Sequence, residues 1–538
     1  MRSRRLRARS ICTLLTLSAS LAGAQGGLSH LDDASILPPG FFRLHAITAW
    51  TRYDALFTGL GGAVAPLSAA YSSDSLGVSQ LPRLASTQNA IQALTGSPFR
   101  LSLGSVHASA SARVVVTPIQ ADYGLSSRLT LGVLVPFVRT RTDIFIRVNP
   151  KGTEGNVGMN PASVNPGALA ADSAVVAQIG SAVAALQTTL QGCKVNANSN
   201  AGCPALLARE SDVNGLLQSA TIYSVALSTV YGASAQVAGA PVVPVTGSAT
   251  DVAIRARIAQ FDSSFHAFLN SAPAISARPA GAGGVVGTSD WQQLARDPAV
   301  GGVDSLATTE RISIGDIELS AKYLIHDGFA DSAGRSALWH SRTTLTGTLR
   351  LGTGLTPTTS NPLDIGTGNG TTQAEGRLAT VIQYGQHAGL SAAGQYAYSL
   401  SRSASNVAAP DYKPAAGSSY ELQLAPRWQI TDLLDAFGAY GFRHVNAMGG
   451  AMPDIQFLSA QLTGPVAYHD GVYTLAGNSQ TVGVGVHYST LSAFGRGSSR
   501  VPIDVGFTHL ETMRGAGQMP KAFRDQVEIR LYYRWRAR

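Results

Sequence analysis

Residues 121–137, with the sequence ADYGLSSRLTLGVLVPF, decide the fold class. Two apolar segments are joined by a short turn, and in the second segment every other side chain is apolar. These side chains are Leu129, Leu131, Val133, Val135 and Phe137. Because successive side chains of a strand point to opposite faces, the pattern predicts a β-hairpin with one apolar face. A similar unit, WQITDLLDAFGAYGF, returns at residues 428–442, so the chain reuses this hairpin.

The composition is low in charge. Among the 538 residues, 57 are glycines, 13% are charged and 45% are hydrophobic. Downstream of the N-terminus no window offers the run of about 18 apolar residues that a transmembrane helix needs. Any membrane signal must therefore come from alternation along strands.

The N-terminus has the pattern of an export signal. Five arginines in residues 1–10 precede an apolar run at 11–21, and Ala22-Gly23-Ala24 supplies small residues for cleavage. We predict a signal peptide at residues 1–24 and a periplasmic leader at residues 25–40. Cleavage removes the five arginines, so the formal charge falls from +8 to +3. This charge gives no indication of a nucleic-acid partner.

Two cysteines remain once Cys12 leaves with the signal peptide. Cys193 and Cys203 are ten positions apart, and in an exported chain this spacing predicts a disulfide. A metal site would need more ligands, and no histidine or further cysteine lies close in the sequence. We therefore expect neither a metal nor a cofactor.

Alternating segments occur twelve times along the chain. The predicted strands lie at residues 41–53, 101–123, 128–146, 312–325, 338–352, 374–384, 390–401, 419–430, 434–444, 480–489, 501–510 and 526–535. Long and short connections alternate between them, as in outer-membrane barrels with short periplasmic turns and long extracellular loops. We predict an all-β fold, a transmembrane antiparallel β-barrel of about 12 strands with 10 to 14 as alternatives, in a Gram-negative-type outer membrane.

The strand pattern stops between residues 147 and 310. Two series of apolar residues recur there at helical spacing, and a third helix is expected near residues 205–228. The two series are Val175, Ile179, Val183, Leu186 and Leu190, then Ile254, Ile258, Phe261, Phe265 and Phe268. They predict amphipathic helices. A separate soluble domain is one interpretation, but the position inside a strand series favours an extracellular insertion that caps or plugs the barrel.

The predicted domain plan follows from these segments. Barrel strands 1–3 with a long loop occupy residues 41–146, the helical insertion occupies residues 147–310, and barrel strands 4–12 occupy residues 311–538.

Charged side chains lie on the polar faces of the strands. By strand parity, ten of them are candidates for lumen-lining selectivity residues: Arg113, Asp316, Glu318, Lys322, Arg342, Arg377, Arg427, Arg443, Glu528 and Arg530. Two interpretations stay open. The charges either form a paired structural network that fills a narrow barrel, or project a field that selects anionic or polar-headed solutes.

Enzyme motifs are missing from the sequence. There is no G-x-S-x-G elbow, no G-x-x-x-x-G-K-[ST] loop, no H-E-x-x-H pair and no C-x-x-C motif. We therefore assign no catalytic residue and predict that the chain is not an enzyme. An outer-membrane lipid hydrolase is the second alternative function.

Four segments resemble a known family: YGLSSRLTLGVLVPF, GDIELSAKYLI, LDIGTGNGTTQAEGRLATVIQY and WQITDLLDAFGAYGF. They look like segments of the outer-membrane barrels grouped with the phenol meta-pathway degradation proteins, which are related in shape to long-chain fatty-acid transporter barrels. The resemblance runs from about residue 104 to the C-terminus. It implies an outer-membrane barrel that takes up small hydrophobic or aromatic compounds. The long N-terminal hatch of the fatty-acid transporters is missing, and the chain ends without a terminal aromatic residue.

The predicted function is an outer-membrane channel or transporter for passive uptake of small solutes, which the resemblance implies to be hydrophobic or aromatic. The alternative is a surface recognition or adhesion module on a structural barrel. The expected partners are outer-membrane lipid, the barrel-assembly machinery and a small-molecule solute, with the chain as a monomer.

Overall fold

The computed structural model describes most of the chain. The described residues are 34–58, 62–69, 72–151, 154–234, 236–301, 308–329, 338–356, 364–368, 370–385, 387–400, 418–446, 466–469, 472–475, 477–517 and 519–534. The predicted signal peptide, the first nine residues of the leader and the last four residues of the chain lie outside this set.

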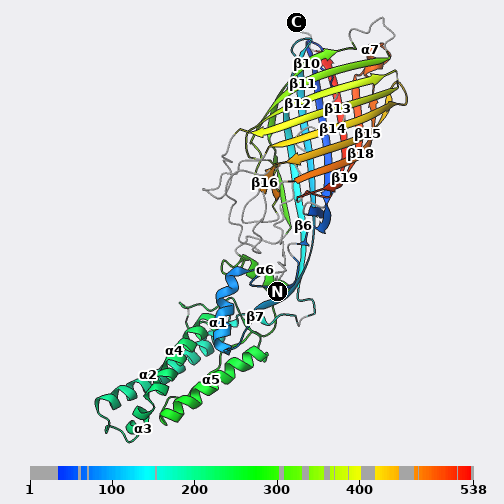
Figure 1. Cartoon of the computed structure of the whole chain (residues 1–538). Coiled ribbons are helices and arrows are strands. Elements are labelled where there is room, and N and C mark those ends of the chain that lie inside the picture. Colours follow the sequence, from blue (N-terminus) through cyan, green and yellow to red (C-terminus); the bar gives the residue numbers. More distant parts are fainter. Residues whose placement is uncertain are drawn as a thin grey trace, which may run out of the picture.

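Within the described residues, twelve strands close into one antiparallel barrel (Figure 1). Their order is β5-β1-β20-β19-β18-β15-β14-β13-β12-β11-β10-β6, and β6 pairs back with β5. The strands are β1 (Phe41–Tyr53), β5 (Ser102–Gly124), β6 (Leu129–Val148), β10 (Ile317–Asp327), β11 (Trp339–Leu351), β12 (Gln373–Tyr384), β13 (Ala388–Ser399), β14 (Ser419–Gln429), β15 (Leu434–Val445), β18 (Gly477–Ser489), β19 (Ile503–Gly515) and β20 (Phe523–Arg534). The predicted twelve-stranded barrel is confirmed.

The outer wall presents apolar side chains at alternate positions. On β6, Leu131, Val133 and Phe137 are 40%, 46% and 49% exposed, while Leu134 between them is buried. Exposed aromatic rings gather at the barrel end that carries the tight β5–β6 and β14–β15 turns, which we name the turn end: Tyr323, Trp339, Tyr384, Trp428, Tyr488 and Tyr533. Such a wall suits lipid hydrocarbon, with rings at the headgroup level.

Strands β5 and β6 continue beyond the barrel wall at the opposite end, which we name the insertion end (Figure 1). Their ladder reaches the pair Val106 and Val148, whereas the β1 ladder on β5 stops at Ala112. Two short strands, β4 (Ser73–Gly77) and β9 (Thr309–Ile314), pair with β5 and β6 respectively. The extension is therefore a hairpin that stands clear of the barrel.

A helical module sits beyond this extension (Figure 1). It contains α1 (Ala85–Thr95), α2 (Pro166–Val195), α3 (Cys203–Ala208), α4 (Glu210–Tyr231), α5 (Ala249–Phe268), α6 (Thr288–Arg296) and the 3-10 turns Pro82–Leu84 and Pro161–Ser163. The remaining elements are β2 (Ala55–Thr58), β3 (Ala63–Pro66), β7 (Val157–Met159), β8 (Val242–Pro244), β16 (Val466–His469), β17 (Val472–Leu475) and α7 (Leu491–Gly495).

The long helices of the module form a core of their own. Ile179 and Leu186 of α2, Leu227 of α4, and Ile258 and Phe265 of α5 are all fully buried. Although α2 is long and apolar enough to cross a membrane, its apolar side chains are used in this core. The module thus buries its hydrophobic faces without entering the barrel.

The long loop predicted between the first two barrel strands spans residues 55–97, and the structure corrects this prediction by placing helix α1 there. This helix packs against α4 and α5 and buries Ile91 and Leu94. The sequence gives no sustained period there because Ala, Ser, Thr, Asn and Gln fill the other positions of its eleven-residue helix.

The disulfide between Cys193 and Cys203 is confirmed. Cys193 lies in the last turn of α2 and Cys203 is the first residue of α3, and both side chains are buried. The bond closes a loop of ten residues at the distal tip of the module.

Replacing both cysteines with serine is expected to destabilise this tip and leave the barrel intact. A loop of this length restricts the unfolded chain by about 3 kcal/mol on a chain-entropy estimate. Limited proteolysis of the purified protein should cut the variant faster near residues 196–202, while its heat-dependent gel migration, which reports the barrel, should not change. Equal protease resistance of the two proteins would contradict this expectation.

Candidate functional site

The interior of the barrel has an apolar sector on three adjacent strands. Ala49 and Tyr53 of β1, Val114 and Val116 of β5, and Val138 of β6 point inward and are at most 3% exposed. All of them except Ala49 belong to one continuous apolar cluster that extends into the helical module. These side chains are buried among other apolar side chains, so this sector of the interior is hydrocarbon in character.

A polar sector lies on the other side of the barrel. The Gln395 amide donates to Glu375 at 2.8 Å, the Arg377 guanidinium donates to Gln423 at 3.1 Å, and Gln423 in turn donates to Glu421 at 2.7 Å. These side chains lie on β12, β13 and β14. In the closed order, β13 is six strands from β1 in either direction, so the polar sector faces the apolar one across the lumen.

Arg350 of β11 ties the polar sector to β10. Its guanidinium lies 2.9 Å from Glu318 and 2.9 Å from Glu375, and its side chain is 4% exposed. This buried group holds two carboxylates and one guanidinium, so its formal net charge is negative. A buried charge that loses its partner is strongly destabilising, so this triad depends on Arg350.

A second ionic group spans the closing strands. Arg43 of β1 pairs with Asp122 of β5 at 2.7 Å, while Glu528 of β20 contacts His45 and accepts from Arg530 at 2.7 Å. Sequence analysis missed Arg43, His45 and Asp122. Arg43 and His45 could have been identified because they lie on the same face of the first strand, two positions apart.

Eight of the ten predicted selectivity residues lie on inward-facing strand positions. Glu318, Lys322, Arg377, Glu528 and Arg530 are buried there. Arg342 pairs with Asp327 at 3.0 Å and Arg427 lies 3.7 Å from Asp435, both near the turn end, while Arg443 is half-buried on β15. The structure brings Glu318 together with Arg350, and Glu528 together with Arg530, and it leaves the others in separate contacts.

Arg113 does not line the lumen. It is opposite Arg52 on β1 and Arg141 on β6, on the outer face, and its side chain is 66% exposed. The prediction is wrong because it places the apolar side of β5 toward lipid. Here that side, with Val114 and Val116, faces the interior.

Asp316 is also not on the lumen surface. Its side chain is fully buried and accepts from the Gly354 amide at 2.9 Å. It lies at a bulge: Ile314 and Glu318 are four positions apart, while their partners Phe137 and Leu134 are three positions apart. The extra residue reverses which side chains point inward, and the sequence gives no sign of it.

The connection after β11 covers the unpaired edge of β9. Thr353 donates to the Gly315 carbonyl at 2.8 Å, Thr367 donates to the Ile314 carbonyl at 3.1 Å, and Arg311 pairs with Asp364 at 2.5 Å. Farther along, the Ile365 carbonyl accepts from Thr140 of β6. This segment therefore crosses the inner side of the wall at the insertion end.

The described end of the leader lies inside the turn end of the barrel. The Leu37 amide donates to inward-facing Thr130 at 2.9 Å, and Ala34 is fully buried. Gly124 allows this approach, since a Cβ there would lie 2.1 Å from the Pro38 carbonyl oxygen. Part of the predicted periplasmic leader thus narrows the mouth from within.

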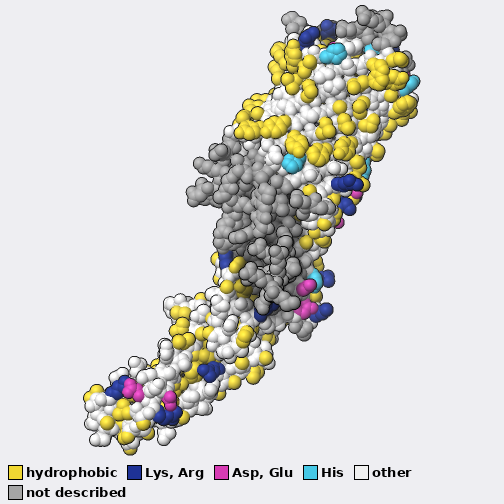
Figure 2. All heavy atoms as spheres, in the orientation of Figure 1, with side chains coloured by type: hydrophobic (Ala, Val, Ile, Leu, Met, Phe, Trp, Pro, Cys, Tyr) yellow, Lys and Arg dark blue, Asp and Glu magenta, His cyan; other side chains and the backbone are white. Residues whose placement is uncertain are grey.

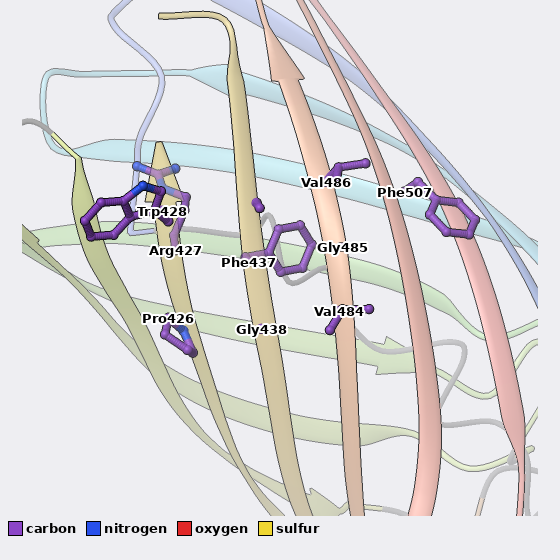
Figure 3. A pocket seen from close by; sticks show the side chains of 10 residues that line it. Pro426, Arg427, Trp428, Phe437, Gly438, Val484, Gly485, Val486 and Phe507 are labelled. Atoms are coloured by element: carbon purple, nitrogen blue, oxygen red, sulfur yellow. The ribbon is translucent and has the colours of Figure 1, made fainter. Parts of the chain in front are cut away.

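A groove of about 670 Å³ opens on the outer wall, not in the lumen (Figure 3). Gly438 and Ala436 form its floor between Pro426 and Trp428 on one side and Val484, Val486 and Phe507 on the other. Because the exposed members lie on the lipid-facing side of their strands, hydrocarbon chains of the membrane fit this groove.

Metal ligands do not gather in the part of the chain that is described. No group of three or more His, Cys, Asp and Glu side chains is arranged to hold an ion there. The interior carboxylates contact guanidinium, amide, hydroxyl or imidazole groups instead.

Comparisons with solved structures find distant barrels. An outer-membrane channel from Pseudomonas putida F1 is 9% identical and superposes with a TM-score of 0.40. The alignment covers 93% of this chain and 98% of that channel. A Pseudomonas aeruginosa FadL homologue is 9% identical, with 92% and 90% covered and a TM-score of 0.26. The Pseudomonas putida toluene transporter TodX is 10% identical, with 93% and 92% covered and a TM-score of 0.25. No family model and no curated protein matches the sequence.

The Arg350→Gln variant is expected to lose about 3–5 kcal/mol of stability, because Glu318 and Glu375 are left without their shared cation. Arg342→Gln, at a partly exposed pair near the turn end, is the matched control and should cost about 1 kcal/mol or less. The measurement is the temperature at which each purified protein loses its folded gel migration. Adding Glu318→Gln and Glu375→Gln to Arg350→Gln should restore most of the loss, and failure to do so would contradict the triad.

Proposed function

We propose that this protein is an outer-membrane channel for passive uptake of small hydrophobic or aromatic solutes that carry a polar group. The observation that carries the proposal is the two-sided interior, with the apolar sector of β1, β5 and β6 opposite the polar sector of β12, β13 and β14. Ligand pockets commonly combine apolar walls with a few oriented polar groups.

The paired charges give the polar sector its second property. Arg377 donates to the amide of Gln423, and Glu375 accepts from the amide of Gln395 and pairs with Arg350. Such a wall offers donors and acceptors without a large free charge, which favours neutral or zwitterionic solutes over strong ions. This favours the structural-network interpretation over selection by a basic excess.

The outer wall supports placement in a membrane. Its alternating apolar residues and exposed aromatic rings match a membrane barrel, and the tight turns favour an orientation with the turn end toward the periplasm. The insertion end then lies outside the cell, and solutes enter past the β11–β12 connection.

Liposomes that contain the protein are expected to swell faster in phenylalanine than in glutamine. Both are zwitterions that cross bare lipid slowly, so the pair isolates the effect of an aromatic side chain. A Val116→Thr/Val138→Thr variant should reduce the phenylalanine preference roughly fourfold, because it removes hydrocarbon from the apolar sector.

Val115→Thr is the matched control, because Val115 neighbours Val116 but points outward and is half-buried. Its preference should equal that of the native chain. Equal swelling in the two solutes, or no swelling beyond that of empty liposomes, would sink the proposed function.

We also infer a second role, surface recognition by the helical module. The observation that favours it is the position of helices α2–α5 beyond the β5–β6 extension, where they bury their apolar faces against one another (Figure 1). A cap or plug would instead pack its helices on the barrel mouth.

Deletion of residues 154–301, with a short Gly-Ser link in their place, separates the two roles of the insertion. A recognition module predicts unchanged single-channel conductance and swelling, because the lumen keeps its walls. A cap predicts a rise in both. The deletion variant should also lose any ligand binding that depends on the module. This binding can be compared between cells that display the native chain and cells that display the deletion variant.

A further inference from the structure

Three arginines lie side by side on the outer face of adjacent strands. Arg52 of β1 is directly opposite Arg113 of β5, which is directly opposite Arg141 of β6. We name these three residues the arginine row. The row ends at Phe523 on β20, whose ring centroid lies 6.0 Å from the Arg52 guanidinium carbon, and at Glu310 on β9.

This arrangement is unfavourable without an anion. Side chains in directly opposed strand positions have Cβ atoms about 5 Å apart, and like charges there destabilise the pair. Two carboxylates offset part of the repulsion. Asp143 lies 2.8 Å from Arg141 and 3.6 Å from Arg113, and Glu310 lies 3.4 Å from Arg141.

Arg139 adds a fourth guanidinium one step nearer the barrel, 2.7 Å from Glu310. Two carboxylates thus serve three arginines of β5 and β6, and Arg52 stacks on a ring. The side chains of Arg113, Arg139 and Arg141 remain 66%, 56% and 43% exposed, so they can contact a further anion.

The row lies at the edge of the lipid-facing wall. On β1 the outward residue before the row is the exposed Trp50, and on β5 it is the half-buried Val115. On β6, Arg139 lies between the row and the exposed Phe137. The three strands therefore change from apolar to guanidinium side chains within one outward position of each other. The change comes at Arg139 on β6, which is opposite Val115, and at Arg52 and Arg113 on β1 and β5. Figure 2 shows the same order on the visible face, with Lys and Arg side chains beyond the margins of a barrel surface that is largely hydrophobic and neutral.

We propose that the arginine row binds the phosphate group of a lipid A-type glycolipid in the outer leaflet. Guanidinium groups bind phosphate through paired hydrogen bonds, and basic clusters at membrane boundaries recognise anionic headgroups. The acyl chains would lie on the exposed Trp50 and Phe137. The inference rests on the proposed outer-membrane placement, with the insertion end outside.

Native mass spectrometry of the detergent-solubilised protein with bis-phosphorylated lipid A tests the proposal. The Arg113→Gln/Arg141→Gln variant should bind about tenfold more weakly than the native chain. The matched control, Arg496→Gln, removes an exposed arginine near the turn end that pairs with Asp432, and it should bind as tightly as the native chain. Equal binding by the double variant and the native chain would overturn the proposal.

Three further arms keep the test decisive if the double variant does not fold. Dephosphorylated lipid A should bind the native chain about tenfold more weakly. Asp143→Asn should bind lipid A more tightly, because it removes a competing carboxylate. Inorganic phosphate alone should not bind at the concentrations used for lipid A. The proposal would be overturned if dephosphorylated lipid A bound as tightly as lipid A. Weaker lipid A binding by Asp143→Asn than by the native chain, or binding of free phosphate as tight as that of lipid A, would also overturn it.

The two proposals fail separately. Phenylalanine swelling in phosphatidylcholine liposomes should be the same for the double variant and the native chain, because the arginine row is outside the lumen. Loss of lipid A binding with normal swelling would remove the glycolipid site only, and lipid A binding without swelling would remove the channel only.

Discussion

The closed backbone ladder is the constraint on which the rest of this structure depends. Lipid offers no partner to an exposed strand edge, so a sheet in a membrane must join its last strand to its first. Here β1 pairs with β20 from Phe41 opposite Arg534 to Arg52 opposite Phe523. Strand β9, which pairs with β6 on one side only, supports the same rule, because Thr367 and Thr353 donate to carbonyl groups at its end and just beyond it in place of a strand.

Closure also determines the interior. A barrel of this strand number encloses a space too narrow for bulk water to screen every inward charge, and too wide to be filled by one layer of apolar side chains. The chain meets both conditions by opposing an apolar sector to a hydrogen-bonded one. Arg350 shows how tightly the polar side is arranged, since one guanidinium serves carboxylates on two strands. A count of the inward charges alone would indicate a basic, anion-selective pore. Because these charges are paired with one another or with amides, the interior is better suited to neutral or zwitterionic solutes.

Alternation predicted the strands well because each wall residue has one of two environments. It predicted the ends of β1 and β5 within one residue. It could not predict which environment each face meets. For Arg113 the error comes from the margin of the wall beside the extension, where charged side chains face outward and apolar side chains face inward. For Asp316 it comes from one inserted residue. Arg43 and Asp122 pair across 79 positions, and strand parity cannot identify partners so distant.

The extension of β5 and β6 explains why these errors cluster. Within the membrane, lipid forces apolar side chains outward, and parity alone tells lumen from lipid. Beyond Phe137 that force ends, and the same strands continue with Arg139 and Arg141 outward while Val114 stays buried within. The outward-facing side chains of β6 thus change from apolar to charged at the expected boundary of the hydrocarbon. At that boundary the guanidinium group of an arginine can reach the lipid headgroups while its aliphatic stem contacts hydrocarbon. Three such arginines in register therefore favour a lipid-binding site over a purely structural role in the barrel wall.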